Sequence, residues 1–462
     1  MLLLLPGQPG YAQIPLFSWS DPFKAKGDSR FAGSKDSSLY VLQSKGNNEV
    51  VVRQFSPGLR LNDERMMSFG TSDHPAQFLL SFVSDTGLVH FQYLFDNKKD
   101  SVILSMGSIA VSSMKAGPTS FVQAFYSSDR SKLLVCNFYF HRKTKIVDRD
   151  FVVLSTKTSE LLYSGTFSYN YTLETTDAIQ VDNLGNAYFQ NISYQRTGSK
   201  FSGKSKGIHS IRVFSPAGAS ANFTISFPGK YVPGIDIIQE DKDAVYIAGL
   251  SYDEDVMASR TSSADLFLYR LDPAGLYYTD SVFTTVNGLY PEGKLKAEDR
   301  LAYTIRHIYE SQSGELVLVA EQYQQTISQY LKKEMYNDIA CIRLNKDKDS
   351  GTAVRIPKLQ FDFDNPSILS TFIDDKVFLL YNDLQENLSA TGETVKYVAN
   401  KNDKNGLFLV TIGKDNKYNK ELLYGYDSGK PMPIILSSSI IHDRTILLCS
   451  DGQVGLLKFV NQ

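Results

Sequence analysis

The chain has 462 residues, of which 42% are hydrophobic, 21% charged and 12% aromatic, a composition typical of a folded protein with a large core. Its formal net charge of −2 gives no overall attraction to nucleic acid, so no nucleic-acid partner is expected. After the first residues, no apolar run reaches the roughly 18 residues of a membrane helix, so we expect no membrane insertion.

The first twelve residues form a short apolar stretch, then helix breakers, then the small residue Ala12 (MLLLLPGQPGYA). This order is typical of the end of a secretory signal peptide cleaved after Ala12, although the usual basic segment is missing. A disordered tail is the alternative. We expect residues 1–12 to be a signal-peptide remnant, residues 13–462 to be a single domain, and the protein to be exported to the periplasm or the cell surface.

Eight short apolar runs of β-strand type recur along the rest of the chain, with hardly a convincing helix among them. Most follow a polar turn signal such as Ser84–Gly87 (SDTG) or Asp182–Asn186 (DNLGN), which supplies the conformations that a hairpin needs. The eight runs are Leu39–Gln43, Leu88–Tyr93, Leu133–Phe138, Ala187–Ile192, Val245–Leu250, Leu316–Ala320, Val377–Tyr381 and Ile446–Ser450.

A second β-type run follows each of these, and the clearest copies end in a Pro-Gly turn that leads to a further strand. Asp265–Gly275 (DLFLYRLDPAG), for example, is followed by Asp280–Phe283 (DSVF). Inner runs are nearly continuous in apolar residues, whereas outer ones such as Thr352–Leu359 mix polar and apolar, as sheet edges do. Each unit is therefore predicted to hold four antiparallel strands in roughly 45–70 residues.

Units of this kind cannot bury their own faces and must stack on one another, and radial stacking protects all but the outermost edges. We predict an all-β fold, a single β-propeller of about eight four-stranded blades. Seven blades is the alternative, because the first unit is poorly defined before Leu39. The last unit ends at Gln453–Val460 without an outer strand, so we expect the N-terminal strand Ile14–Ser20 to join this C-terminal blade and close the ring.

Two segments carry a resemblance to known repeats. Val181–Tyr194 (VDNLGNAYFQNISY) resembles the repeat core of the β-propeller superfamilies, and Asp265–Phe283 is similar to repeats in secreted propellers of Bacteroidota-type bacteria. The resemblance covers almost the whole chain and implies an architecture but no chemistry, because propellers host many functions. The Trp-Asp ending of WD repeats, the Gly-Gly pair of kelch repeats and the sialidase motif are missing, so no functional residue is carried over.

The sequence holds no recognisable catalytic motif. The three cysteines, Cys136, Cys341 and Cys449, lie far apart in apolar runs and are interpreted as buried hydrophobic residues. The six histidines are scattered without a metal-binding spacing, so no metal site and no cofactor are predicted. Asp362 and Asp364 alternate before a proline, where a solvated turn is favoured over an incomplete calcium site.

Loop length is the most informative functional feature. The link between second and third strands is short in the first unit, Ser44–Asn48, but long in four consecutive units, at roughly 193–209, 251–264, 321–337 and 382–405. These links leave the same edge of their blades and crowd one face, where long loops are often functional, although neutral drift is the alternative. Thr326–Met335 is the helix candidate of the chain. Tyrosines expected to be exposed there are the candidate binding residues Tyr194, Tyr252, Tyr323, Tyr330, Tyr336 and Tyr397.

These features favour a non-enzymatic binding or scaffold propeller that engages a protein or glycan partner through the long loops, as a monomer or within an envelope complex. The alternative is a glycan-active hydrolase or lyase, which needs two carboxylates about 5–10 Å apart in the axial pocket.

Overall fold

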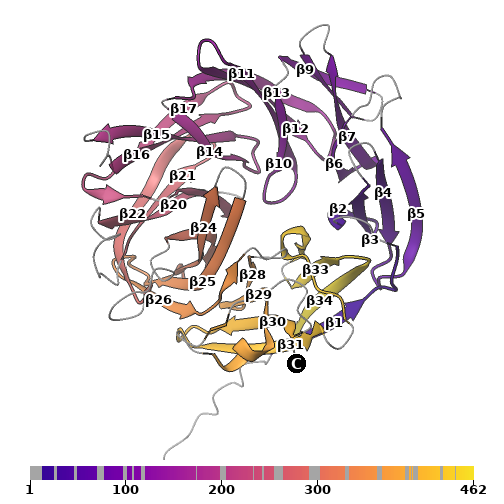
Figure 1. The fold of residues 1–462 in the computed structure, drawn as a ribbon, viewed down its shortest axis with the longest axis vertical. Coiled ribbons are helices and arrows are strands. Elements are labelled where there is room, and N and C mark those ends of the chain that lie inside the picture. The colour runs from indigo at the N-terminus through magenta and orange to yellow at the C-terminus, as the bar shows by residue number, and fades with distance from the viewer. Residues whose placement is uncertain are drawn as a thin grey trace, which may run out of the picture.

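Eight four-stranded antiparallel units stand in a ring around a common axis in the computed structural model (Figure 1). The structure describes residues 13–24, 29–45, 49–69, 77–96, 101–106, 109–115, 120–172, 174–197, 204–232, 234–241, 244–253, 264–290, 302–327, 332–361, 367–390, 395–396, 398, 404–426, 430–442 and 444–461. Six units are separate sheets, and the other two are joined into one sheet by a short parallel pairing of Val286 with Gly351 and Asn287 with Thr352. The described residues therefore form eight blades, which confirms the predicted all-β propeller.

The first two strands of each blade lie on the inner side of the ring (Figure 1). The first strands are β2 (Ser29–Lys35), β6 (Gln77–Ser84), β10 (Phe121–Tyr126), β14 (Glu174–Val181), β19 (Asp236–Asp241), β23 (Tyr303–Glu310), β28 (Leu369–Ile373) and β32 (Ser439–His442). The second strands contain the eight runs predicted from the sequence. They are β3 (Ser38–Ser44), β7 (Gly87–Asp96), β11 (Lys132–His141), β15 (Ala187–Thr197), β20 (Ala244–Asp253), β24 (Leu316–Ile327), β29 (Lys376–Leu384) and β33 (Thr445–Ser450).

The third and fourth strands complete each blade toward the outer rim. The third strands are β4 (Glu49–Phe55), β8 (Ser101–Met106), β12 (Ile146–Ser155), β16 (Lys204–Phe214), β21 (Ala264–Asp272), β25 (Lys332–Leu344), β30 (Asn405–Ile412) and β34 (Gln453–Asn461). The outer strands are β5 (Leu61–Ser68), β9 (Ile109–Lys115), β13 (Leu161–Asn170), β17 (Ser220–Ile225), β22 (Tyr277–Asn287), β26 (Gly351–Ile356), β31 (Tyr418–Gly425) and β1 (Gln13–Trp19). Two-residue strands β18 (Lys230–Tyr231) and β27 (Gln360–Phe361) and the short helices η2 (Gln385–Ser389) and η5 (Ile435–Ser437) lie between these elements.

The turn between first and second strands is built by local side-chain chemistry. In the fourth blade the Asp182 carboxylate accepts hydrogen bonds from the backbone N–H groups of Leu184 and Asn186, at 3.0 and 2.8 Å, and Gly185 adopts a positive φ of 94°. The Asn186 amide also donates to the Pro273 carbonyl of the next blade at 2.8 Å. The D-x-x-G-N signal thus fixes both the hairpin turn and a contact between blades.

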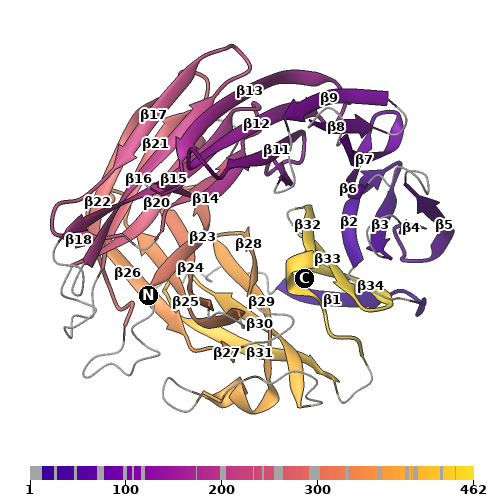
Figure 2. The ribbon, with the colours of Figure 1, turned by 45° about the horizontal axis from the view of Figure 1, so that its top comes forward.

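The N-terminal strand closes the ring (Figure 2). β1 pairs antiparallel with β34 over seven residues, from Gln13 opposite Asn461 to Trp19 opposite Gly455. It therefore supplies the outer strand of the blade that otherwise holds only β32, β33 and β34. This is the closure expected from Ile14–Ser20, and it leaves the last blade with the same four strands as the others.

Apolar side chains pack between neighbouring blades and form the core. Val41 and Phe55 of the first blade, for example, are buried against Leu447 and Leu456 of the last. Cys136, Cys341 and Cys449 are buried and unpaired, as expected from their apolar surroundings. Because burial lies between the sheets, each blade depends on a neighbour on either side.

The contact between Trp19 and Gly455 gives a direct test of the closure. A Cβ at position 455 would lie 2.8 Å from Trp19 Cε3, so Gly455→Ala requires the Trp19 ring to leave its place over β34. We expect a loss of about 1–3 kcal/mol in the free energy of unfolding, the usual cost of overpacking, measured by denaturant titration. Trp19→Leu in the same chain removes the clash. The free energy of unfolding of the double variant should therefore fall by less than the sum of the losses in the two single variants. Unfolding of Gly455→Ala at the parent midpoint would contradict this account.

Candidate functional site

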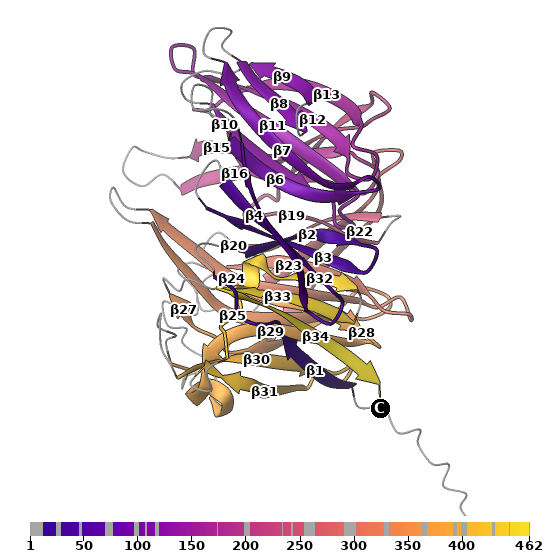
Figure 3. The same ribbon diagram turned by 90° about the vertical axis from the view of Figure 1, so that its right-hand side faces the viewer.

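Two of the long links predicted from the sequence are extended hairpins on one side of the ring, at the ends of β15 and β24 (Figure 3). β15 and β16 pair as far as Thr197 and Lys204, and β24 and β25 pair as far as Ile327 and Lys332. In the first blade, by contrast, β3 and β4 have seven residues each. We call this side of the ring, where second strands pass to third strands, the long-loop face.

The helix predicted over Thr326–Met335 is wrong. Thr326 and Ile327 belong to β24, and Lys332–Met335 belong to β25, with Ile327 opposite Lys332. The segment has the composition of a helix, but strand pairing with the flanking residues overrides this propensity.

The six candidate tyrosines do not form one exposed set. Tyr252 is 5% exposed, and its hydroxyl accepts a hydrogen bond from the Tyr303 backbone N–H at 3.2 Å. Tyr336 is also buried. The exposure expected for these two is therefore wrong, because the ends of β20 and β25 are covered by neighbouring elements. Tyr323 is half-buried and donates its hydroxyl proton to Glu334 at 3.1 Å.

The other three candidate tyrosines are Tyr194, Tyr330 and Tyr397. The backbone of Tyr194 lies in β15 opposite Gly207. Tyr330 and Tyr397 lie outside the described residues, as do Asp362 and Asp364. A binding role for any of the six tyrosines stays a prediction.

A buried charge network supports the base of the β24–β25 hairpin. The Glu321 carboxylate lies at the end of the apolar part of β24 and accepts hydrogen bonds from the Lys358 ammonium and the Ser367 hydroxyl, the latter at 2.9 Å. Arg306 approaches the same carboxylate to 3.2 Å. The side chains of Glu321 and Lys358 are fully buried. Burial lowers the pKa of Lys358, and the negative charge of Glu321 opposes this shift.

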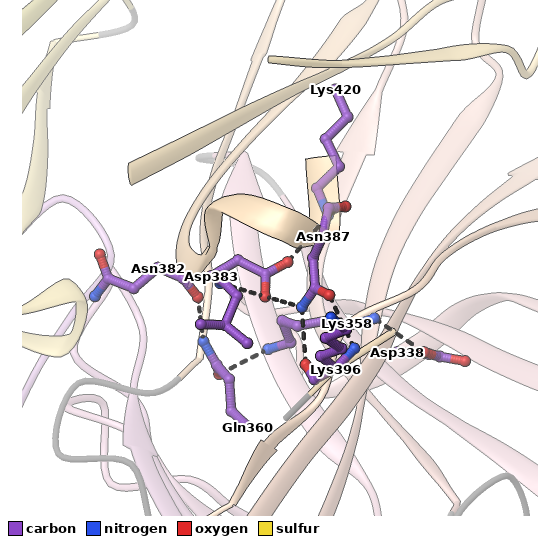
Figure 4. Close-up of polar contacts among 9 residues, drawn as sticks. Asp338, Lys358, Gln360, Asn382, Asp383, Asn387, Lys396 and Lys420 are labelled. Carbon is purple, nitrogen blue, oxygen red and sulfur yellow. Dashed lines mark hydrogen bonds and ion pairs between the residues drawn. The ribbon is translucent and has the colours of Figure 1, made fainter. Parts of the chain in front are cut away.

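The network continues into the next blade (Figure 4). Lys358 donates to the Gln360 side-chain oxygen at 3.1 Å, and the Gln360 amide donates to the Asn382 carbonyl at 2.7 Å. The buried Asp383 carboxylate accepts a hydrogen bond from the Lys420 ammonium at 3.0 Å. Burial raises the pKa of Asp383, and the positive charge of Lys420 opposes this shift. The Asn387 amide donates to Asp383 at 2.7 Å.

The two halves of the network hold two long links in place. The Asn387 amide donates to the Lys396 carbonyl and its oxygen accepts from the Lys396 N–H, both at 2.8 Å. The Val398 N–H donates to the Leu359 carbonyl at 3.1 Å. Each buried charge named in these contacts faces an opposite charge, so the network is suited to rigid support of the long-loop face rather than to proton transfer. No sequence pattern points to this network, because Glu321, Lys358 and Asp383 are far apart in the chain.

Four cavities of about 450–810 Å³ lie along the axis and are lined mainly by the first strands. All four share Tyr126, at the end of β10, and three of them share Arg130 in the following turn. Each cavity is lined by at most one carboxylate among the described residues, from Glu310, Asp236 or Asp129. None of these cavities by itself is therefore lined by the two carboxylates that glycoside hydrolysis requires.

Within the described residues, no three His, Cys, Asp or Glu side chains are grouped so that they hold a metal ion. Likewise, none of the helices in that part of the chain has the length and apolar character needed to cross a membrane.

Comparison with known proteins finds only distant structural likeness. No protein-family model and no curated protein matches the chain. The Dos1 propeller is 10% identical over 96% of both chains, with a TM-score of 0.46. The WD40 domain of SCAP from fission yeast is 11% identical over 97% of this chain and 98% of that one, with a TM-score of 0.40. The β-propeller domain of the Trilobed protease from Pyrococcus furiosus is 11% identical over 88% and 98%, with a TM-score of 0.36. Such distant likeness carries nothing about partner or reaction.

The charge network gives the prediction for this site. Lys358→Met leaves the Glu321 carboxylate buried with one cation fewer, and we expect a loss of about 3 kcal/mol in the free energy of unfolding. Lys396→Met removes an exposed partner of Glu386 and serves as the matched control, with little expected change. Chemical denaturation of both variants measures the difference. Equal effects of the two substitutions would contradict a supporting role for the buried pair.

Proposed function

We propose that this chain is a non-enzymatic binding propeller that engages a protein partner through the long-loop face. The observation that carries the proposal is the β24–β25 hairpin, whose strands of 12 and 13 residues run beyond the short outer strand β26 and rest on a closed, buried charge network. Rigid support of a projecting segment lowers the ordering cost of binding. A glycan partner is the alternative occupant of the same face.

The proposal also includes export of the protein to the periplasm or the cell surface. The apolar residues before Ala12 and the similarity to secreted Bacteroidota-type propellers support export to the periplasm or the cell surface. Cleavage after Ala12 would make Gln13, the first residue of β1, the start of the mature chain. The glycan-active hydrolase or lyase has less support, because none of the four axial cavities by itself is lined by two carboxylates.

Shortening the hairpin tests the binding face. Gln325 pairs with Glu334, so Thr326–Lys333 can be replaced by an Asn-Gly turn, which suits a two-residue hairpin loop. We expect partner recovery from the envelope fraction, followed by affinity measured with the purified partner, to fall about tenfold or more. The thermal midpoint should change little, because the buried network is untouched.

A matched control lies on the opposite face of the same blade. Lys346→Ala with Asp347→Ala changes two exposed residues of the turn between β25 and β26 and should leave binding intact. Unchanged affinity in the shortened hairpin would remove the proposal. If recovery is blocked by soluble oligosaccharides, the partner is a glycan.

The mature N-terminus tests export separately. We expect N-terminal sequencing and intact mass of the protein from the envelope fraction to give a chain that starts at Gln13. A chain in the cytoplasmic fraction that retains residues 1–12 would contradict export. The binding face is tested separately by the shortened hairpin.

A further inference from the structure

The turn after β10 places a cation at the axis of the ring. Residues Ser127–Ser131 bend over the neighbouring fourth blade, where the Asn183 side-chain oxygen accepts hydrogen bonds from the Ser128 hydroxyl and the Asp129 N–H, both at 3.1 Å. Arg130 itself adopts a positive φ of 58° and its carbonyl accepts the Thr156 hydroxyl at 2.6 Å. The backbone on both sides of Arg130 is therefore fixed, and its positive φ is that of the same turn position in the fourth blade, Gly185.

The Arg130 guanidinium lies between two aromatic rings and has no ion pair within the described residues. Its carbon lies 5.1 Å from the centre of the Phe31 ring and 5.0 Å from the centre of the Tyr126 ring. Nη2 donates to the Phe31 carbonyl at 3.2 Å, whereas Nη1 is buried without a hydrogen-bond partner. Burial lowers the pKa of Arg130. A buried guanidinium nitrogen without an acceptor is costly for folding, and an anion that reached Nη1 would supply the missing acceptor.

The largest of the axial cavities described, of about 810 Å³, is positively charged. Arg30 and Arg130 both line it, and its lining contains no aspartate or glutamate. Ser81 also lines it and shares a hydrogen bond of 2.6 Å with His90, whose pKa is lowered to about 4 by burial and by Arg65, so this histidine is neutral at pH 7. The two arginines therefore set the charge of this cavity.

The rest of the same cavity is largely apolar and partly open to solvent. Leu79, Leu80 and Phe125 line it and are half-buried, and Leu436 of η5 lines it while 66% exposed. A cavity of several hundred Å³ with an apolar wall and a few polar groups has the size and character of a small-molecule site. The first strands of the first three blades form most of this wall, so the cavity depends on the closed ring.

We propose that this axial cavity binds an amphipathic organic anion, with its carboxylate or phosphate head on Arg130 and its apolar body against Leu79, Phe125 and Leu436. Charge complementarity selects the head, because the cavity holds two arginines and no carboxylate. The apolar wall selects the body. Because Nη1 is buried in the structure, its contact with a ligand oxygen requires the guanidinium to shift. This site lies at the axis among the first three blades and does not include the β24–β25 hairpin.

Calorimetric titration of the full chain with simple probes tests the site. We expect octanoate to bind at one site, octan-1-ol and acetate to bind about tenfold more weakly or not at all, and octyltrimethylammonium not to bind. Octyl phosphate distinguishes a phosphate head from a carboxylate head by its affinity relative to octanoate. No binding of octanoate or octyl phosphate below their critical micelle concentrations, or equal affinity for octan-1-ol, would overturn the proposal.

Substitutions then locate the head. Arg130→Gln should weaken octanoate about tenfold and Arg30→Gln less, whereas Arg60→Gln, an exposed arginine outside the lining of the four axial cavities, should have no effect. Gln123→Glu adds a carboxylate to the same lining with almost no change in shape, so it tests the charge even if Arg130→Gln does not fold. Octanoate affinity that is unchanged in Gln123→Glu would show that the positive cavity is not the binding site.

Discussion

The pairing of β1 with β34 is the constraint on which the rest of the ring depends. Seven paired residues join the two ends of the chain, and the Trp19 ring lies directly over Gly455. Apolar clusters lie between blades rather than within them, so an open ring would expose one face of the first blade and one of the last. Closure removes both exposed faces at once, which is why a strand from one terminus completes the blade of the other.

Closure also sets what the axis and the faces can do. The first strands of distant blades meet at the axis, so Arg130 contacts Phe31 although 99 residues separate them. The links between second and third strands meet on one face, where Glu321 and Lys358 support a projecting hairpin. The two candidate sites therefore differ in origin: one depends on the whole ring, and the other on two neighbouring blades.

The repeat could be predicted from the sequence because its signals are local. Residues a few positions apart determine the turn at Asp182–Asn186, the apolar second strands and the polar outer strands. The closure by β1 could be predicted because the last unit lacks an outer strand. Burial of Tyr252 and Tyr336 could not be predicted in this way, because it depends on which neighbouring element covers the end of a strand. The same holds for the pair of Glu321 with Lys358 and for Arg130, which in sequence is one residue of an ordinary turn.

Comparison of the two charged sites gives the physical distinction between support and binding. Under the long-loop face, Glu321 and Asp383 each face a lysine, so the cost of taking these charges out of water is offset within the fold. At the axis, Arg130 is held between Phe31 and Tyr126 with aromatic faces and one carbonyl as its partners among the described residues. Cation–π contacts return about 0.5–2 kcal/mol, less than burial of an unpaired charge costs. A network of paired charges serves stability, whereas an arginine with no ion pair among the described residues is suited to bind an anion from outside the fold.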